Sequence, residues 1–465
     1  MVLLVLVLAI QFRKPRETDV QKYLARLRAQ GEKVTFQELI RGIAPDSSLA
    51  HDFILTNVPR LPSCNLDAKI IFDDPYGRPG QAGVDWRSPR PPMTSTSGEI
   101  LTWDQFNEIM LQAQGPLGEI RESLKTASLA GKVGTNAMDS MPGSISAFRN
   151  SARWFNVKVT GELHQGRPAE ALADIETLAA LAKVNLSPAN LLSTAWRMGA
   201  SKIALSATWE ALQFPGWSDT QLEQMQEAWE PLDQLTIAEA GIGGERVLGI
   251  EYWDLLRRSS ISPLANRGKT ATRTWRELVK EWTPDAGYRI YKMTSLNQDE
   301  LFYLAGFQEA IDTIRAVKGG RPQVLQNFKT NAPDQKLGPP SGPPFNRYYF
   351  SNLLMPKLSG LVQHMAQSET VRQMTLTAIA IRRYQLRHGI PPADLTMLCP
   401  EFLSQPTYDP MSGKPLRYRP GTNGDWLLYS IGEDGVDDGG DPTPRKGATA
   451  GFWTGRDAVW PRAGE

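Results

Sequence analysis

Close to the carboxyl end, the chain carries acidic and glycine residues whose types suit a metal ion. Four carboxylates stand in a short run in which glycines let the backbone turn: Asp434, Asp437, Asp438 and Asp441. Carboxylate and backbone carbonyl oxygens are the ligands that calcium prefers, although the spacing does not fit an EF-hand. Without a cation, the crowded carboxylates would repel one another. The residues therefore favour a calcium site, with a site for magnesium or another ion and a solvated loop without metal as the alternatives.

The elements that must position this loop are a helix and a hairpin. From Gln367 onward, apolar residues recur at helical steps with arginines between them, and Gly389 with two following prolines ends this amphipathic helix. Two short strands joined by a turn are predicted at residues 416–419 and 426–430. The predicted order is helix, tight turn, hairpin and acidic loop.

This order resembles the globular part of the major pseudopilins of type II secretion systems and of related type IV pilin-like proteins. The matching motifs are the helix end at His388-Gly389, the Asp409-Pro410 turn and the sequence LYSIGEDG at 428–435. The resemblance covers roughly the last fifth of the chain. In that family the closing loop binds calcium, so the resemblance implies the following calcium ligands: Asp434, Asp437, Asp438, Asp441 and Asp457.

The chain also departs from the pattern of that family. There the globular part directly follows an amino-terminal transmembrane helix, with a leader glycine and with a glutamate shortly after the processing point. Here most of the chain precedes the module, and neither residue stands near Met1. Assembly by helix stacking is therefore not expected, and the module is interpreted as a fold recruited for binding or for stabilising the chain.

The amino terminus has an aliphatic run followed by basic residues. The first ten residues are almost purely aliphatic, and Arg13, Lys14 and Arg16 come after them. A spanning helix needs about 20 apolar residues, so this run alone is too short. Part of a longer anchor, the core of a signal peptide and a buried end of a soluble chain are the alternatives. The anchor is favoured: residues 1–17 are predicted to hold the protein in a bacterial inner membrane by a single pass, with the bulk of the chain extracytoplasmic, in the periplasm.

Composition and periodicity divide the chain into the segments of a mainly α protein. They are short juxtamembrane helices at 18–60, an extended linker at 61–100, a helical domain at 101–318, a Pro/Gly-rich linker at 319–345 and a pilin-like α+β module at 346–465. The helical domain is expected to contain antiparallel helices, one pair of which resembles a tetratricopeptide hairpin that turns near Gly166. No second copy follows at the period of that repeat, so an array is not predicted.

Sequence patterns for common catalytic sites are incomplete. Gly268-Lys269-Thr270 resembles the end of a phosphate-binding loop, but Pro263 occupies the position of its first glycine. The four histidines lack metal-ligand spacing, and two cysteines leave little material for a zinc or redox site. The 51 Lys and Arg residues balance 50 Asp and Glu residues, which gives no electrostatic case for binding nucleic acid.

These observations favour a non-catalytic, membrane-anchored interaction or assembly protein. Its calcium-stabilised, pseudopilin-like module would link it to type II secretion or to a pilus-like apparatus, with protein partners and the membrane as its contacts. The alternative is a hydrolase-type enzyme whose cation site lies between the helical domain and the terminal module. An open coordination position facing a cleft would favour that enzyme. A third possibility is a helical scaffold that binds peptides in a groove lined by tryptophans.

Overall fold

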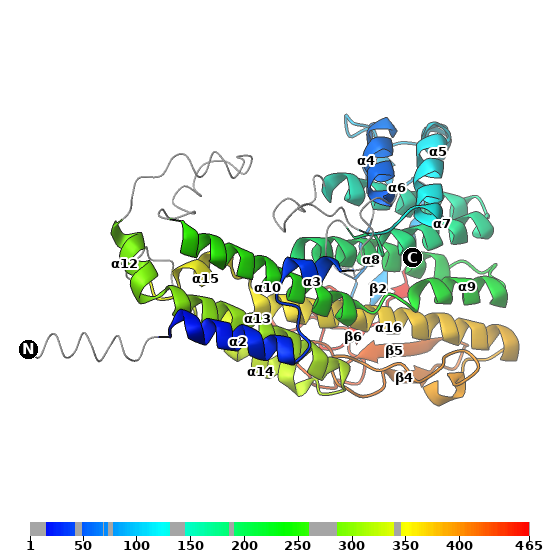
Figure 1. Cartoon of the computed structure of the whole chain (residues 1–465). Coiled ribbons are helices and arrows are strands. Elements are labelled where there is room, and N and C mark those ends of the chain that lie inside the picture. The colour runs from blue at the N-terminus through cyan, green and yellow to red at the C-terminus, as the bar shows by residue number, and fades with distance from the viewer. Residues whose placement is uncertain are drawn as a thin grey trace, which may run out of the picture.

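The computed structural model describes residues 15–41, 49–67, 69–72, 78–130, 145–185, 190–259, 286–338 and 346–464. Helices dominate these residues, and the strands are few and short (Figure 1). The prediction of a mainly α protein is therefore confirmed.

The first part of the chain forms short elements that pack against later helices. They are α2 (Glu17–Ala29), α3 (Phe36–Ile40), α4 (Ala50–Asn57), the 3-10 turn η1 (Val58–Arg60), β1 (Asn65–Leu66), β2 (Gln81–Ala82), the 3-10 turn η2 (Asp85–Arg87) and β3 (Met93–Thr94). β1 and β3 pair in antiparallel fashion. The described part of the segment predicted as an extended linker, 61–100, therefore holds only such two- and three-residue elements.

A set of longer helices follows, which is here called the helical body. It consists of α5 (Trp103–Thr126), α6 (Ile145–His164), α7 (Pro168–Leu181), α8 (Leu191–Leu212), α9 (Asp219–Trp229) and α10 (Gln234–Arg258). α6 and α7 form the predicted hairpin, and Gly166 between them has a φ of 70°, a left-handed conformation that glycine adopts without strain. The remaining helices before the module are α12 (Ala286–Thr294), α13 (Leu296–Lys318), α14 (Gln323–Asn331) and the 3-10 turn η3 (Pro333–Lys336).

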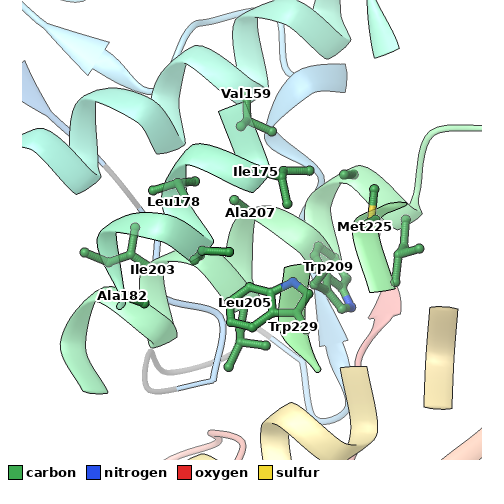
Figure 2. Close-up of a cluster of buried hydrophobic side chains, with 14 of the residues drawn as sticks. Val159, Ile175, Leu178, Ala182, Ile203, Leu205, Ala207, Trp209, Met225 and Trp229 are labelled. Atoms are coloured by element: carbon green, nitrogen blue, oxygen red, sulfur yellow. The ribbon is translucent and has the colours of Figure 1, made fainter. Parts of the chain in front are cut away.

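Apolar side chains of α5 to α9 form a continuous core (Figure 2). Val159, Ile175 and Leu178 come from α6 and α7, and Figure 2 shows them facing Ala207 and Trp209 of α8. Trp209 and Trp229 are fully buried. Large aromatic side chains of this kind contribute much of the buried apolar area of a core.

The terminal module begins with α15 (Tyr349–Leu354) and the long helix α16 (Leu358–His388). α16 lies between the helical body and the terminal strands (Figure 1), in contact with α8, α9, α10, α13, α14 and β5 (Trp426–Ser430). Every residue from Met365 to Ile381 is buried. This helix was predicted to be amphipathic, but both its faces are covered. Its threonines fit a buried position because the hydroxyls of Thr370, Thr375 and Thr377 donate to carbonyl oxygens one turn earlier.

α16 also joins two separate apolar clusters. Its first half, from Leu358 to Ala366, packs with α10, α13 and α14, whereas its second half, from Val371 to Tyr384, packs with α6 to α9 and the strands. α14 lies within the segment predicted as a linker, 319–345, and packs against both α13 and α16. The helical body and the terminal module therefore share their hydrophobic cores.

The strands of the terminal module form a small antiparallel sheet in the order β4-β5-β6, with β4 (Arg417–Pro420) and β6 (Ala458–Val459) on either side of β5. The predicted hairpin is confirmed, with Tyr418 opposite Leu428. The last strand, β7 (Arg462–Ala463), leaves this sheet and pairs in parallel with β2. The carboxyl-terminal tail is thus tied to a strand from the first hundred residues.

The prediction of a single-pass membrane anchor at residues 1–17 needs correction, together with the membrane as a partner and the inner-membrane, extracytoplasmic location. No helix formed by the residues with described positions combines the length and the apolar character needed to cross a bilayer. Residues 1–14 of the predicted anchor lie outside the described residues, and Glu17 begins α2.

Candidate functional site

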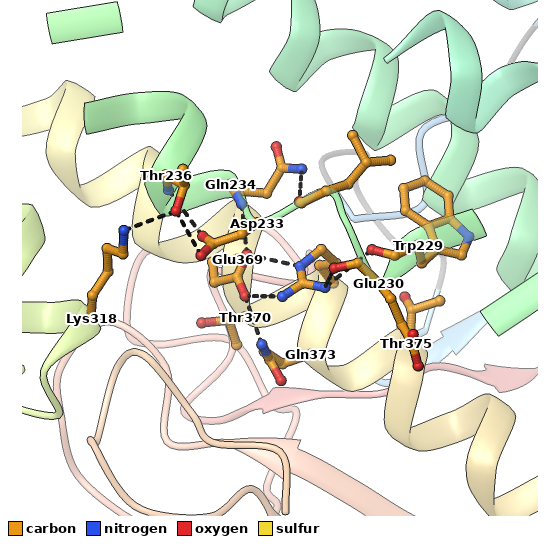
Figure 3. Close-up of polar contacts among 12 residues, drawn as sticks. Trp229, Glu230, Asp233, Gln234, Thr236, Lys318, Glu369, Thr370, Gln373 and Thr375 are labelled. Carbon is orange, nitrogen blue, oxygen red and sulfur yellow. Dashed lines mark hydrogen bonds and ion pairs between the residues drawn. The ribbon is translucent and has the colours of Figure 1, made fainter. Parts of the chain in front are cut away.

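A buried ion pair on α16 lies beneath the turn that joins α9 to α10. Arg372 binds both carboxylate oxygens of Glu369, with Nη2 2.7 Å from Oε1 and Nε 3.0 Å from Oε2. Arg372 Nη1 also donates to the carbonyl oxygens of Trp229 (3.1 Å) and Glu230 (3.3 Å) at the end of α9. Figure 3 shows Glu369 beside Gln234 at the start of α10, whose backbone amide donates to Glu369 Oε2 at 2.8 Å.

This geometry places a cation at the carboxyl end of one helix and an anion at the amino end of the next. Both placements match the partial charges of helix ends and satisfy backbone groups that have no partner within the helix. Although burial opposes the charge of Arg372, the Glu369 carboxylate holds the pKa of that guanidinium above its ordinary value. Gln373 Nε2 donates to Glu369 Oε1 at 2.7 Å. The polar groups of the pair are occupied by structural partners, so we interpret it as a clamp between the helical body and the terminal module.

A second clamp lies farther along α16. Arg383 Nε donates to Asp219 Oδ1 at 2.9 Å, and its Nη2 donates to Glu223 Oε1 at 2.6 Å. Its Nη1 reaches Gln226 Oε1 at 3.3 Å. These three partners come from α9, so α16 is tied to the same helix at two places.

A cleft of about 410 Å³ opens where the helical body meets the terminal module, and is here called the seam cleft. Its lining comes from the end of α8, from α16, from the β4–β5 turn and from the last residues of the chain. The lining residues are Leu212, Gln213, Ala378, Arg382, Asn423, Gly424, Asp425, Trp426, Trp460, Pro461, Arg462 and Ala463.

Arg382 is the charged residue of α16 in this cleft, and it is partly buried. Its one hydrogen bond to a described residue is a long one, 3.5 Å from Nη1 to Gln385 Oε1. Among the described residues, no carboxylate lies within ion-pair distance of its guanidinium, and burial lowers its pKa below the ordinary value for arginine. Arg382 is therefore a partly desolvated cation without an anionic partner from the described part of the chain.

The other charges of the seam cleft pair with each other at its rim. Arg462 Nη1 lies 3.7 Å from Asp425 Oδ2, and both side chains are more than half exposed. Trp460 is buried, whereas Trp426 is partly exposed. The cleft thus combines indole surface with one unpaired cation.

Two of the predicted calcium ligands, Asp437 and Asp441, have other partners. Asp437 binds Arg417 Nε at 3.0 Å and accepts the Tyr429 hydroxyl at 3.0 Å, and its bond with Arg417 lowers the pKa of this carboxyl. Asp441 accepts the Thr443 amide at 2.9 Å, which lowers its pKa. Both side chains thus help to fold the loop against its surroundings.

The remaining predicted ligands, Asp434, Asp438 and Asp457, also have partners within the chain. Arg456 stands between Asp438 and Asp441, with N–O distances of 3.5 and 3.6 Å. Asp434 is exposed and accepts the Val436 amide at 3.1 Å. Asp457 is buried, and its Oδ2 accepts the backbone amides of residues 440 and 441 at 2.8 and 3.2 Å.

The acidic loop meets only part of the requirements of a calcium site. Asp457 Oδ1 is buried without a hydrogen-bond partner, and burial raises the pKa of this carboxyl. However, the described residues contain no group of three or more His, Cys, Asp or Glu side chains placed to hold a metal ion. Two arginines, Arg417 and Arg456, pair with three of the five aspartates, so calcium would compete with these guanidinium groups for the carboxylates. Calcium binding stays a prediction from the sequence, and the described contacts do not favour it.

Glu210 of α8 is a perturbed acid that the sequence did not single out. It is buried, and its Oε1 accepts the Trp86 backbone amide at 2.8 Å. Burial, reinforced by the nearby Asp85 carboxylate, raises the pKa of Glu210 to about 8. No motif surrounds Glu210 in the sequence, because Trp86 and Asp85 approach it from a segment far away along the chain. Since its carboxyl group accepts the Trp86 backbone amide, Glu210 fixes the segment around η2 to α8.

No protein-family model, curated protein or solved structure matches this chain. No relative therefore supports the predicted links to type II secretion or to calcium.

Removing one member of the α16 clamp should destabilise the protein strongly. We expect Arg372→Met to lower the free energy of unfolding by about 3–5 kcal/mol, because Glu369 is left buried without its cation. The double variant Glu369→Gln/Arg372→Met should lose less than the single variant. Urea unfolding measures both. Arg387→Met, which removes a more exposed arginine of the same helix, should destabilise the protein much less, because water screens its ion pairs. An equal loss in both single variants would contradict the clamp.

The pKa of Glu210 predicts a pH-dependent stability. The pKa of Glu210 is higher in the folded chain than the ordinary value of 4.5, so the folded state binds the proton more tightly than the unfolded state. The stability that this proton contributes is present in full below pH 4.5 and is lost as the pH rises through about 8. Glu210→Gln removes the titrating group, so the free energy of unfolding of the variant should depend less on pH than that of the wild type. Relative to the wild type, the variant should gain on the order of a few kcal/mol between about pH 5 and about pH 9. Urea unfolding at both values tests this. The exposed Glu122→Gln should show no such difference, and parallel pH profiles for wild type and Glu210→Gln would refute the assignment.

The ion pairs of the acidic loop predict that calcium does not change the thermal stability of the protein. Because Arg417 and Arg456 already lie against its carboxylates, we expect the melting temperature to be the same in excess calcium and in excess EDTA. Differential scanning calorimetry measures this shift. A saturable rise with calcium that disappears in Asp457→Asn would instead support a calcium site, by ligand linkage.

Proposed function

We propose that this protein is a non-catalytic interaction protein that binds its ligand or partner in the seam cleft. The observation that carries the proposal is Arg382, a partly buried cation in the cleft with no anionic partner among the described residues. Keeping a charge away from water without compensation is costly, so an anionic ligand would gain from the site. Concave sites with indole surface and a few polar groups are typical of ligand binding.

We propose in addition that the terminal module is pilin-like and serves as a fixed part of the body. Support comes from the packing of α16 on a three-stranded antiparallel sheet, with the acidic loop folded over the outer side of the sheet through Arg417 and Tyr429. Helix stacking into a filament needs an exposed helix face. Because residues 365–381 are all buried, this helix offers no such face over that length.

The alternative of a hydrolase with its site between the body and the module receives less support. Acid–base catalysis of glycoside hydrolysis, for example, uses two carboxyl groups that flank the reacting bond. The lining of the seam cleft includes one carboxylate, Asp425, which is paired with Arg462. The lining contains no histidine, cysteine or serine. These residue types favour binding over catalysis in this cleft.

Site-specific photo-crosslinking tests the proposed function. A benzoylphenylalanine placed at Asn423, an exposed lining residue, should form an adduct of discrete mass in cells that naturally make the protein. The same group at Leu111, exposed on α5 and outside the lining, should not form it. Intact-mass spectrometry and gel electrophoresis would detect small and protein adducts. Identical products at both positions, or filaments in electron micrographs of the purified protein, would contradict the proposal.

A further inference from the structure

The four arginines in the second half of α16 differ in a way that points to the ligand. Arg372 and Arg383 each bind a carboxylate of the chain, as described above. Arg387 binds Asp219 and Glu401. Arg382 alone among these four has no carboxylate partner within the described residues, although it is less exposed than Arg387. Its position in the wall of the seam cleft leaves the guanidinium available to a group that enters from outside.

We infer, on the basis of the function proposed above, that the ligand of the seam cleft carries a carboxylate on an apolar or aromatic body. The planar guanidinium of Arg382 offers two parallel N–H donors that match a carboxylate. Two arginines and one aspartate in the lining leave one net positive charge, which equals the charge that a single carboxylate neutralises.

A phosphate fits the same lining less well. Phosphate sites supply several donors, often from lysine, hydroxyl groups or successive backbone amides. The lining residues include no lysine, serine or threonine, and Gln213 Nε2 already donates to the Trp209 carbonyl oxygen at 2.9 Å. The donors in the lining therefore suit a singly charged anion that binds through one pair of oxygens, as a carboxylate does.

The apolar part of the lining defines the rest of the ligand. Leu212, Ala378 and Trp460 are buried side chains of the wall, and the partly exposed Trp426 offers an indole surface next to the β4–β5 turn. A volume of about 410 Å³ falls in the range of sites for small molecules, about 300–1,000 Å³. A free aromatic acid and the carboxyl-terminal residue of a peptide present the same chemistry to such a cleft.

Calorimetric titration with matched probes tests the inference on the full chain. The probes are indole-3-propionate and its amide, and the peptide N-acetyl-Gly-Gly-Trp with a free or an amidated carboxyl terminus. We expect at least one carboxylate probe to bind at least tenfold more tightly than its amide. Tighter binding of the peptide would identify a chain terminus as the source of the carboxylate, and tighter binding of indole-3-propionate would identify a free acid.

Three variants connect the preference to Arg382. Arg382→Gln should remove the difference between acid and amide, and Arg382→Lys should keep part of it, because the charge remains but the paired donors are lost. Arg387→Gln, on the same helix and outside the lining, should keep all of it. Melting curves control for folding. We expect Arg382→Gln to melt close to wild type, because no ion pair within the described residues is broken.

Different results would overturn the two proposals separately. Equal binding of acids and amides, unchanged preference in Arg382→Gln, or no binding of any probe would refute the carboxylate inference. The proposal that the seam cleft is a binding site would then still be tested independently by the crosslinks from position 423 described above.

Discussion

The buried Glu369–Arg372 pair is the interaction on which the arrangement of the two halves depends. It lies where α16 passes from one apolar cluster to the other, so its charges are far from water and need partners. The end of α9 and the start of α10 supply these partners, because helix ends present unpaired carbonyl and amide groups. The same hydrogen bonds therefore supply partners both to the ion pair and to the two helix ends. These bonds form when α16 lies directly under the α9–α10 turn.

The seam cleft follows from this constraint. Arg382 stands ten residues after Arg372, about 15 Å farther along the helix axis. The side chain of Arg383 points toward α9, where it binds Asp219. The preceding residue, Arg382, therefore faces a different side of α16, the boundary with α8, the β4–β5 turn and the tail. β7 closes this boundary by pairing with β2. The cleft is thus formed by the end of α8 and by segments of the terminal module, and ion pairs outside it hold these elements in place.

The acidic loop shows how far residue types alone can be interpreted. Clustered aspartates and glycines are compatible with a hard cation, and the sequence contains no information on which other charges approach them. In the folded chain, Arg417 comes from the neighbouring strand and Arg456 from the tail, and each lies against the loop. Guanidinium groups can neutralise such carboxylates as a metal ion would. The same residues therefore allow a loop that is stabilised within the chain.

Local chemistry determined much of this protein from the sequence alone. Helical periodicity, the glycine at 389 with its φ of 76° and the β4–β5 hairpin were predictable because each depends on neighbouring residues. Only the tertiary structure decided which arginines have carboxylate partners, that both faces of α16 are buried, and that the pKa of Glu210 is raised. These properties depend on contacts between residues that are far apart in the chain. Such contacts decide whether a buried charge has a partner of opposite charge, has a shifted pKa, or stays available to a ligand. Arg382 and Arg383 are adjacent residues of the same type, and only their surroundings separate a candidate binding residue from a structural one.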